Sequence, residues 1–402
     1  MLKLVLPGIK KIEFLTQKDP NAISFAQGAL RIGGVHETIR MHAQEILKTD
    51  KADYYANVLG IAALREKLAT ILSATHGLKL TIDNLMISHG SVGGIVAFCL
   101  TMLGEGDEVV LPQPTYPVYQ NVVKIAKATP VMVDVYVEVN NGNGPAWEFD
   151  LDRIKAATTE RTKLIMFSNP SNPLGFCISK IDLENLIAWC VSKNIYLLMD
   201  EVYDDYIFEA TFNSIMPYLQ QSPLLIRAGS FSKNFGMSGW RVGYLAADAT
   251  VIAHFMGTQD AILCCPNVLA QYAALYALDH KNLVSTYVEK VKQSRKIALT
   301  NLQPLVDEGF ISFIRPSANF YLFIKTNEIE TTPLVYALLA EAKVGLVPGG
   351  DFGTNSGSYM RLCYARDPEL VRIGTDRMVD FFRSTGMHKV GTKSTNPIMK
   401  NI

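Results

Sequence analysis

The chain carries little charge and no excess of either sign. Its 402 residues include 38 basic and 38 acidic side chains, which make up 19% of the sequence. Proteins that bind nucleic acid or an anionic membrane surface carry a clear excess of Lys and Arg. The even balance argues against both as the main partner.

The sequence lacks an apolar run long enough to span a membrane. The longest run, 92–103, is well short of the ~20 residues that a spanning helix needs. At the N-terminus, Pro7-Gly8 and Lys10-Lys11 interrupt the apolar residues before they reach the length of a signal peptide. We expect a soluble protein of the cytoplasm.

Cysteine is scarce and poorly placed for metal binding. The six cysteines are scattered along the chain, and no two of them form a Cys-x-x-Cys pair. Zinc sites and disulfide frameworks need cysteines in recognisable spacings. We therefore expect buried thiols in a reducing compartment and no metal site.

Apolar residues are abundant and make up 49% of the chain. From residue 84 onward, short apolar runs alternate with segments of helical periodicity. This alternation predicts an α/β fold with a mostly parallel, seven-stranded sheet flanked by helices. The strands are expected at 85–88, 108–111, 131–137, 164–168, 195–199, 224–228 and 242–246.

The length of the chain favours two domains. Residues 282–303 contain neither Gly nor Pro and predict a helix that ends before Pro304 and leads into a smaller α+β domain. We divide the chain into an N-terminal segment that joins the small domain and covers the substrate site (1–45), a large domain (46–285), the small domain (286–386) and a polar tail (387–402).

One lysine stands in an unusual setting. Lys233 lies in the stretch RAGSFSKNFGMSGWRVGYLAA, between an apolar run and the next predicted strand, where glycines favour a turn. Most lysines are solvated surface charges. Here Ser230, Ser232 and Arg241 are close in sequence, and hydroxyls and a guanidinium are good donors to a phosphate monoester. Because a primary amine condenses with an aldehyde, this group predicts a site for pyridoxal phosphate.

Two further segments can contact such a cofactor. ISHGSVGGI leads from a strand into a helix, and the backbone at Gly90, Ser91 and Val92 can bind phosphate there. An ordinary strand–helix turn would also explain this segment. LPQPTYPVY places Tyr116 on a loop, where its ring can stack on a heteroaromatic ring or simply pack.

Two polar segments also follow predicted strands. SNPSNPLG contains two Asn-Pro steps that force a stiff turn, and Asn172 is the expected donor to the phenolic oxygen of the cofactor. In IYLLMDEVYDDY an apolar strand ends in Asp200, at the end where α/β sheets place their sites. A carboxylate that faces the pyridine nitrogen keeps it protonated. We assign this role to Asp200. We expect Tyr203 to form a hydrogen bond with the phenolic oxygen of the cofactor.

A single arginine interrupts an apolar strand near the end of the chain. In SYMRLCYA, Arg361 has apolar neighbours on both sides. Charges in strands are often edge or surface residues. A guanidinium can also hold a carboxylate bidentately and thereby aim the Cα–H of an amino acid at Lys233. We assign Arg361 to the α-carboxylate of the substrate.

In order and spacing, these segments resemble the class I and II aminotransferases, which are pyridoxal-phosphate enzymes of fold type I. The resemblance runs from about Gly28 to Arg361. It implies that Lys233 forms the Schiff base, that 46–285 bind the cofactor and that Tyr116 stacks on its ring. Phosphate ligands are then Gly90, Ser91 and Val92 through the backbone, Ser230, Ser232 and Arg241 through side chains, and Tyr55 from the other subunit of a homodimer.

The resemblance implies that the enzyme moves the amino group of an L-amino acid to a 2-oxo acid, with 2-oxoglutarate as the expected acceptor. Lys233, Asp200 and Tyr203 would be catalytic, and Gly28 and Asn172 would join Arg361 around the substrate. GALRIGG departs from the Gly-x-Pro segment of the family, and Arg31 is the candidate for a second substrate carboxylate.

Two alternatives to a transaminase stay open at this point. A pyridoxal-phosphate lyase, decarboxylase or synthase would share the same core residues. The second alternative is a module that binds the cofactor or a ligand without catalysis, and the neutral charge of the chain argues against its use in a DNA-binding regulator.

Overall fold

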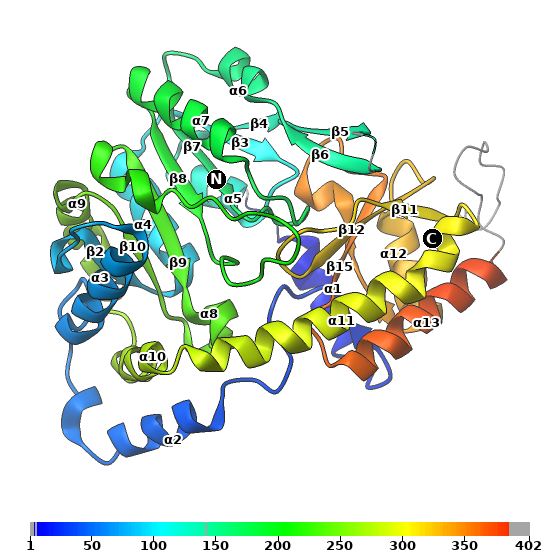
Figure 1. Cartoon of the computed structure of the whole chain (residues 1–402), viewed down its shortest axis with the longest axis horizontal. Helices are drawn as coiled ribbons and strands as arrows, with labels where there is room; N and C mark the ends of the chain where they lie inside the picture. Colours follow the sequence, from blue (N-terminus) through cyan, green and yellow to red (C-terminus); the bar gives the residue numbers. More distant parts are fainter. Residues whose placement is uncertain (1–3, 5, 141, 143, 386–402) are drawn as a thin grey trace.

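The computed structural model describes residues 4, 6–140, 142 and 144–385. It contains a large sheet with helices on both sides and a smaller sheet beside a long helix, α11 (Asn282–Asp307) (Figure 1). The predicted tail, 387–402, lies outside the described residues. Within the described ranges, no helix has the length and apolar character to cross a membrane.

The large sheet has seven strands in the order β2-β10-β9-β8-β7-β3-β4. Its neighbouring strands are parallel except around β10, which runs antiparallel to β2 and β9. The predicted α/β fold with a mostly parallel seven-stranded sheet is therefore confirmed. The strands are β2 (Leu85–Ser88), β3 (Glu108–Gln113), β4 (Thr129–Asp134), β7 (Thr162–Ser168), β8 (Tyr196–Asp200), β9 (Leu225–Ser230) and β10 (Gly243–Ala246).

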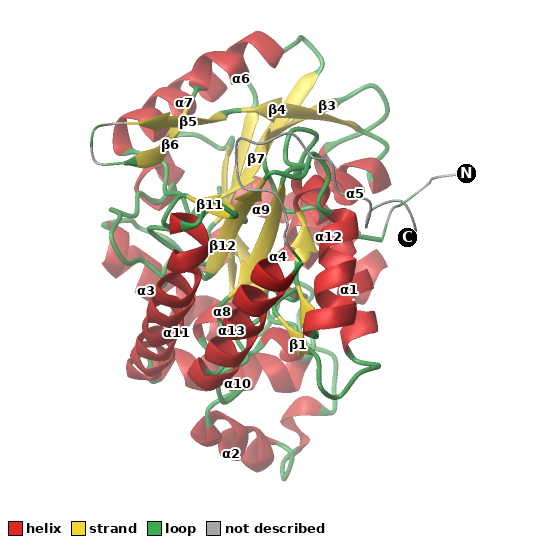
Figure 2. Cartoon of the chain, turned by 90° about the vertical axis from the view of Figure 1, so that its right-hand side faces the viewer, coloured by secondary structure: helices red, strands yellow, loops and turns green. Residues whose placement is uncertain are grey.

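The sequences of the central strands are continuous apolar runs, because both faces of these strands are buried. In β7, Leu164 and Met166 pack in one cluster with α4 and α9, whereas Ile165 and Phe167 pack in another with α7. Figure 2 shows the strands between their layers of helices. The helices around this sheet are α3 (Ala62–His76), α4 (Gly90–Met102), α5 (Val118–Ile125), α6 (Leu151–Ala157), α7 (Lys180–Ser192), α8 (Phe231–Asn234), α9 (Ala249–Leu263) and α10 (Val268–Asp279).

The smaller sheet is antiparallel, in the order β11-β12-β15-β14. α11 leads into it and packs lengthwise against the last helix, α13 (Figure 1). The elements of this part are β11 (Ile311–Phe313), β12 (Tyr321–Thr326), α12 (Thr332–Ala337), β14 (Val347–Pro348), β15 (Tyr359–Cys363) and α13 (Pro368–Ser384).

Two predicted boundaries are wrong. α11 continues through Pro304, because the Glu308 N–H still bonds to the Pro304 carbonyl at 2.9 Å and Leu305 is buried in the core. The single strand predicted over 131–137 is instead the end of β4 and the start of a hairpin, β5 (Tyr136–Asn140) and β6 (Pro145–Phe149). The apolar run across Val135 contains no Gly or Pro that would signal the break.

The N-terminal residues contact both parts of the molecule. α1 (Gly8–Thr16) and β1 (Ile23–Ser24) pack near the small sheet, where β1 pairs in parallel with β13 (Val344–Gly345). α2 (Glu37–Ile46) packs instead against α10 of the large part (Figure 1). α1 was not predicted from the sequence. The division into 1–45, 46–285 and 286–386 stays a prediction.

A buried ion network lies under the loops of the large sheet. Arg227 of β9 has a side chain that is 3% exposed, and its Nε donates to Glu201 Oε2 at 2.8 Å. Its guanidinium also bonds to Asp204 and, at 2.8 Å, to the Tyr244 hydroxyl. Glu201 further accepts from the Ser214 hydroxyl at 2.6 Å. Burial makes each charge costly alone, so the network holds only as a complete set.

This network gives a stability prediction. Arg227→Met leaves the Glu201 and Asp204 carboxylates without their cation, and we expect a loss of about 3–5 kcal/mol in the free energy of unfolding. The midpoint of urea unfolding measures it. Arg372→Met is the control, because Arg372 pairs with Glu369 and Asp376 on an exposed helix face and its loss should hardly move the midpoint. Equal shifts in both variants would contradict the interpretation.

Candidate active site

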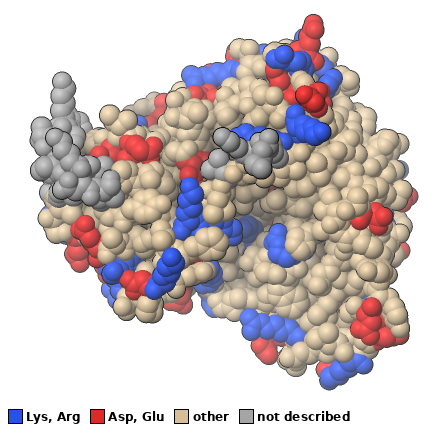
Figure 3. All heavy atoms as spheres, turned by 180° about the vertical axis from the view of Figure 1, so that it is seen from behind, with Lys and Arg blue, Asp and Glu red and all other residues tan. Residues whose placement is uncertain are grey.

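The carboxyl ends of the parallel strands meet at one edge of the large sheet. A cavity of about 530 Å³ opens there, lined by residues that directly follow β2, β3, β7, β8 and β9 and by others from the N-terminal segment and β15. On the face seen in Figure 3, Lys and Arg side chains gather around a hollow. Of the predicted site residues, those that line the cavity are Gly28, Ser91, Val92, Tyr116, Asn172, Asp200, Tyr203, Ser230, Ser232, Lys233, Arg241 and Arg361.

Lys233 reaches this cavity from the one-turn helix α8. The Ser230 hydroxyl caps that turn by accepting from the Ser232 N–H at 3.1 Å. The Lys233 amine donates to the Gly28 carbonyl and lies 5.8 Å from the centre of the Tyr203 ring. Burial lowers the pKa of Lys233 to about 8, although the Asp200 carboxylate acts in the opposite direction. The amine is therefore a far better nucleophile and proton acceptor near neutral pH than an exposed lysine.

Asp200 ends β8 as a buried carboxylate. Its Oδ2 accepts from the Tyr119 hydroxyl at 2.7 Å, whereas Oδ1 is buried without a hydrogen-bond partner among the described residues. Burial raises the pKa of Asp200 to about 6, and the Tyr119 hydrogen bond and the Lys233 charge oppose that rise. The carboxylate is thus ionised at neutral pH. An unpartnered anionic oxygen fits a protonated ring nitrogen, as the pyridine of pyridoxal phosphate would present.

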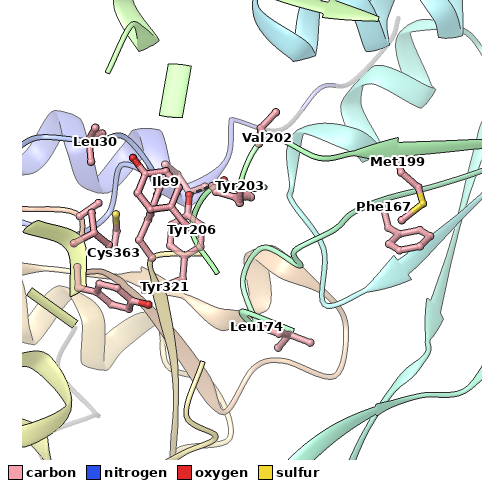
Figure 4. Close-up of a cluster of buried hydrophobic side chains, with 14 of the residues drawn as sticks. Ile9, Leu30, Phe167, Leu174, Met199, Val202, Tyr203, Tyr206, Tyr321 and Cys363 are labelled. Carbon is pink, nitrogen blue, oxygen red and sulfur yellow. Dashed lines mark hydrogen bonds between the residues drawn. The ribbon is translucent and has the colours of Figure 1, made fainter. Parts of the chain in front are cut away.

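A chain of polar groups runs along one wall of the cavity. The Tyr203 and Tyr321 hydroxyls lie 2.9 Å apart, and the Asn172 side-chain amide donates to Tyr203 at 3.4 Å. Figure 4 shows Tyr203 and Tyr321 close together, with Ile9 and Leu30 of the N-terminal segment in the same cluster. Asn172 and Tyr203 therefore lie together, in a position to share one acceptor such as a phenolate oxygen.

Arg361 is fully buried at the floor of the cavity. Its Nη1 donates to Asn172 Oδ1 at 2.8 Å and its Nη2 to the Ala26 carbonyl at 2.6 Å. Its guanidinium lies 4.3 Å from the centre of the Tyr321 ring and its Nε has no partner among the described residues. A buried cation with an unused donor fits a carboxylate ligand.

Part of the cavity wall forms where α4 begins. Ser91 and Val92 stand in its first turn, where backbone N–H groups have no partner within the helix. Arg241 lies beside it in left-handed backbone (φ 59°), and its Nη2 donates to the His89 carbonyl at 3.2 Å. Gly90 has left-handed backbone (φ 69°), a conformation that favours glycine, and a Cβ there would also lie 2.5 Å from Arg241 Nη2.

Two predicted residues do not line the cavity. Gly90 contributes through its contact with Arg241. Tyr55 is 85% exposed on the loop after α2. Two tyrosines of the site were not predicted from the sequence: Tyr119, which bonds to Asp200, and Tyr321, which bonds to Tyr203. Tyr119 lies in the segment LPQPTYPVY, where a second tyrosine was the available signal.

Arg31 does not fit its predicted role as a cation for a second substrate carboxylate. It lines the cavity, but its guanidinium is paired with Glu13 of α1, and its side chain is 49% exposed. Glu13 also accepts from the Ser24 hydroxyl at 2.6 Å. The pair is therefore close to neutral, with a buried Glu13 and a half-exposed Arg31.

Comparison with known proteins gives consistent results. The family model described as aminotransferase class I and II matches residues 20–378. The chain is 29% identical over 334 residues to an aspartate aminotransferase from Sulfolobus acidocaldarius, covering 81% of this chain and 82% of that one. It is 29% identical over 382 residues to aromatic-amino-acid aminotransferase 2 from Thermococcus litoralis, covering 94% and 96%.

A solved structure agrees in fold. Aspartate aminotransferase from Thermus thermophilus, determined with maleate, is 27% identical and superposes with a TM-score of 0.83 over 93% of this chain and 95% of that one. The family model spans most of the described residues, including every residue that lines the cavity around Lys233 except Pro7, Ile9 and Lys10. The chain therefore belongs to the class I and II aminotransferases, enzymes of fold type I that depend on pyridoxal phosphate.

Proposed function

We propose that this enzyme transfers the amino group of an L-amino acid to a 2-oxo acid, with 2-oxoglutarate as the acceptor, in the cavity around Lys233. One observation carries the proposal. A partly buried amine of lowered pKa, Lys233, shares the cavity with a buried carboxylate, Asp200, and a buried guanidinium, Arg361. Aspartate and aromatic aminotransferases among the relatives support it.

The residues divide between cofactor and substrate. Pyridoxal phosphate supplies an aldehyde that condenses with amines and a ring that withdraws electrons from the bond broken at Cα. Asp200 would bond to its ring nitrogen, Tyr116 would stack on the ring, and Tyr203 with Asn172 would hold the phenolic oxygen. The phosphate would lie in the cradle of Ser91, Val92, Ser230, Ser232 and Arg241.

Substrate orientation and proton movement depend on two charged residues. Arg361, next to Asn172 and Gly28, would bind the α-carboxylate and so fix the direction of the Cα–H bond. The Lys233 amine, already within hydrogen-bond distance of the Gly28 carbonyl, would take the Cα proton and return it to C4′ of the cofactor.

We also propose a homodimer in which Tyr55 of each subunit reaches the phosphate site of the other. Large apolar side chains on α2 and the following turn are unusually exposed: Met41 55%, Leu47 64%, Tyr54 71% and Tyr55 85%. Exposed apolar residues in such number are typical of a surface that a partner covers.

A cytoplasmic location is the last part of the proposal. The six cysteines, all within the described residues, are free thiols. Burial raises the pKa of Cys99, Cys177 and Cys190 to about 12, which keeps them protonated and slow to oxidise. Free thiols in this number are typical of a reducing compartment.

The first test is the visible absorption spectrum of the cofactor-loaded protein, followed as L-amino acids are added one at a time. If the enzyme is a transaminase, one particular amino acid should bleach the visible absorption band of the bound cofactor at near-neutral pH. Addition of 2-oxoglutarate should then restore that band. Release of ammonia or an elimination product without any need for 2-oxoglutarate would replace the proposal with a lyase.

Lys233→Ala tests the residue that carries the chemistry. We expect transamination to fall to background, because the amine assigned to move the Cα proton is lost, while the protein still binds pyridoxal phosphate through its phosphate cradle. Equilibrium dialysis measures the binding. Lys292→Ala, an exposed lysine paired with Glu289, is the control and should keep full activity. Full activity in Lys233→Ala would overturn the assignment.

The pKa of Lys233 predicts how the cofactor-free protein captures pyridoxal phosphate. The neutral amine attacks the aldehyde and the ammonium form does not. With a pKa of about 8 instead of the ordinary 10.5, the capture rate should rise with pH and level off above about 8. Stopped-flow absorbance from pH 6 to 10 measures it. Asp200→Asn should move the midpoint lower, since the Asp200 charge raises that pKa. A midpoint near 10.5 in the wild type would refute the prediction.

Tyr119→Phe tests a positioning residue. Loss of the hydroxyl removes a hydrogen bond that lowers the pKa of Asp200, so that pKa rises and the carboxylate protonates nearer to neutral pH. We expect kcat/KM to fall roughly 10- to 100-fold at pH 6 and less at pH 8, with the acid limb of the profile shifted to higher pH. Tyr218→Phe, which removes a hydroxyl bonded to Glu184, is the control. An unmoved acid limb would contradict the role.

A further inference from the structure

A second cavity lies on the other side of the short helix that carries Lys233. It has a volume of about 310 Å³ and is lined mainly by residues of α3, α8, the start of α11 and the loop that follows β8 (Figure 1). Two residues of α8, Ser232 and Lys233, line the first cavity, whereas Phe231 and Asn234 line the second. The helix α8 is therefore a wall that the two cavities share.

Much of the lining of the second cavity is apolar. Side chains from one face of α3 meet the rings of α8 and its C-terminal cap, which stack with their centres 5.9 Å apart. The apolar side chains include Leu68, Ile71, Leu72, Phe231, Phe235 and Leu278. A cavity of this volume lies at the lower end of the range that holds small molecules, so it suits one ring or a short alkyl chain.

The polar part of the lining contains two neighbouring carboxylates, Asp204 and Asp205. The Asp204 side chain is 25% exposed, and its Oδ1 accepts from Asn234 Nδ2 at 3.2 Å. The other end of that amide, Asn234 Oδ1, is buried without a hydrogen-bond partner among the described residues. A buried acceptor without a donor costs free energy, so this oxygen fits an N–H group that a ligand would supply.

The charges around the second cavity favour a cation. The buried ion network holds two carboxylates for the single guanidinium of Arg227 and so keeps one negative charge. Asp205 adds another, and Lys281, an exposed residue just before α11, offsets one of the two. Burial and the Arg227 charge lower the pKa of His76 to about 4, so this ring is neutral at pH 7. The described groups therefore leave about one negative charge uncompensated.

We propose that the second cavity binds a small organic cation, an ammonium group on an apolar body the size of a phenylethyl group. The ammonium would lie beside Asp204 and Asp205 and donate to Asn234 Oδ1. The apolar body would pack on α3 and on the rings of α8, away from water. The inference goes beyond the proposed function, because this site shares only a wall with the cavity of Lys233 and takes no part in moving the amino group.

Calorimetric titration of the cofactor-loaded protein with N,N-dimethylphenethylamine tests the proposal, because a tertiary amine cannot condense with the cofactor aldehyde. Asp205→Asn should weaken binding about 10-fold or more, since the ammonium loses one carboxylate. Asp279→Asn is the matched control. Asp279 adjoins Leu278 of the lining but pairs with Lys67 and is not one of the described residues that line the second cavity. Its loss should change the affinity less than about twofold. Equal losses in both variants would overturn the proposal.

A steric variant and a neutral analogue locate the amine and test its charge. Thr75 lines the second cavity and is exposed on α3, so Thr75→Trp should fill the rim and abolish binding of the amine while the midpoint of urea unfolding stays unchanged. 2-Phenylethanol, which has the same ring without the charge, should bind the wild type at least about 10-fold more weakly than the amine. The proposal is wrong if Thr75→Trp binds the amine as the wild type does, if the alcohol binds as tightly as the amine, or if the wild type does not bind the amine.

Discussion

Parallel alignment of strands is the constraint on which this site depends. Because β2, β3, β7, β8 and β9 run in one direction, the loops that follow them meet at one edge of the sheet. Asp200 is the last residue of β8, and Lys233 follows β9 by three residues. The apolar strands hold these ends in register, since each is packed on both faces.

Burial then shifts the pKa values of the charged residues at this edge of the sheet. The same loss of water that raises the pKa of Asp200 lowers the pKa of Lys233, because each charged form is less stable away from solvent. Tyr119 counteracts the rise at Asp200 by donating to it. The result is a carboxylate still ionised at neutral pH and an amine that readily gives up its proton, within one cavity.

Segments from opposite ends of the chain close the substrate side of that cavity. Arg361 of β15 bonds to the carbonyl of Ala26 and to Asn172, so one side chain joins the N-terminal segment, the small sheet and a loop of the large sheet. Arg366 adds further bonds to the carbonyls of Ser24 and Gln27. Both arginines donate mainly to backbone or amide oxygens, which leaves the positive charge of Arg361 available to a ligand.

The sequence by itself determined the large sheet and most of its site. Apolar runs that alternate with helical segments indicated buried parallel strands. Polar residues at the ends of these runs, such as Asn172, Asp200 and Lys233, indicated a site, because adjacent parallel strands end at the same edge of the sheet. The sequence did not predict the features that depend on contacts between distant residues. Pro304 stays helical because tertiary packing holds its turn, and the run through Val135 breaks because a hairpin forms beside the sheet. Only the tertiary structure brought Tyr119 to Asp200, Glu13 to Arg31 and Lys10 to the cavity, since no local pattern encodes pairings between residues so far apart in the chain or on separate elements.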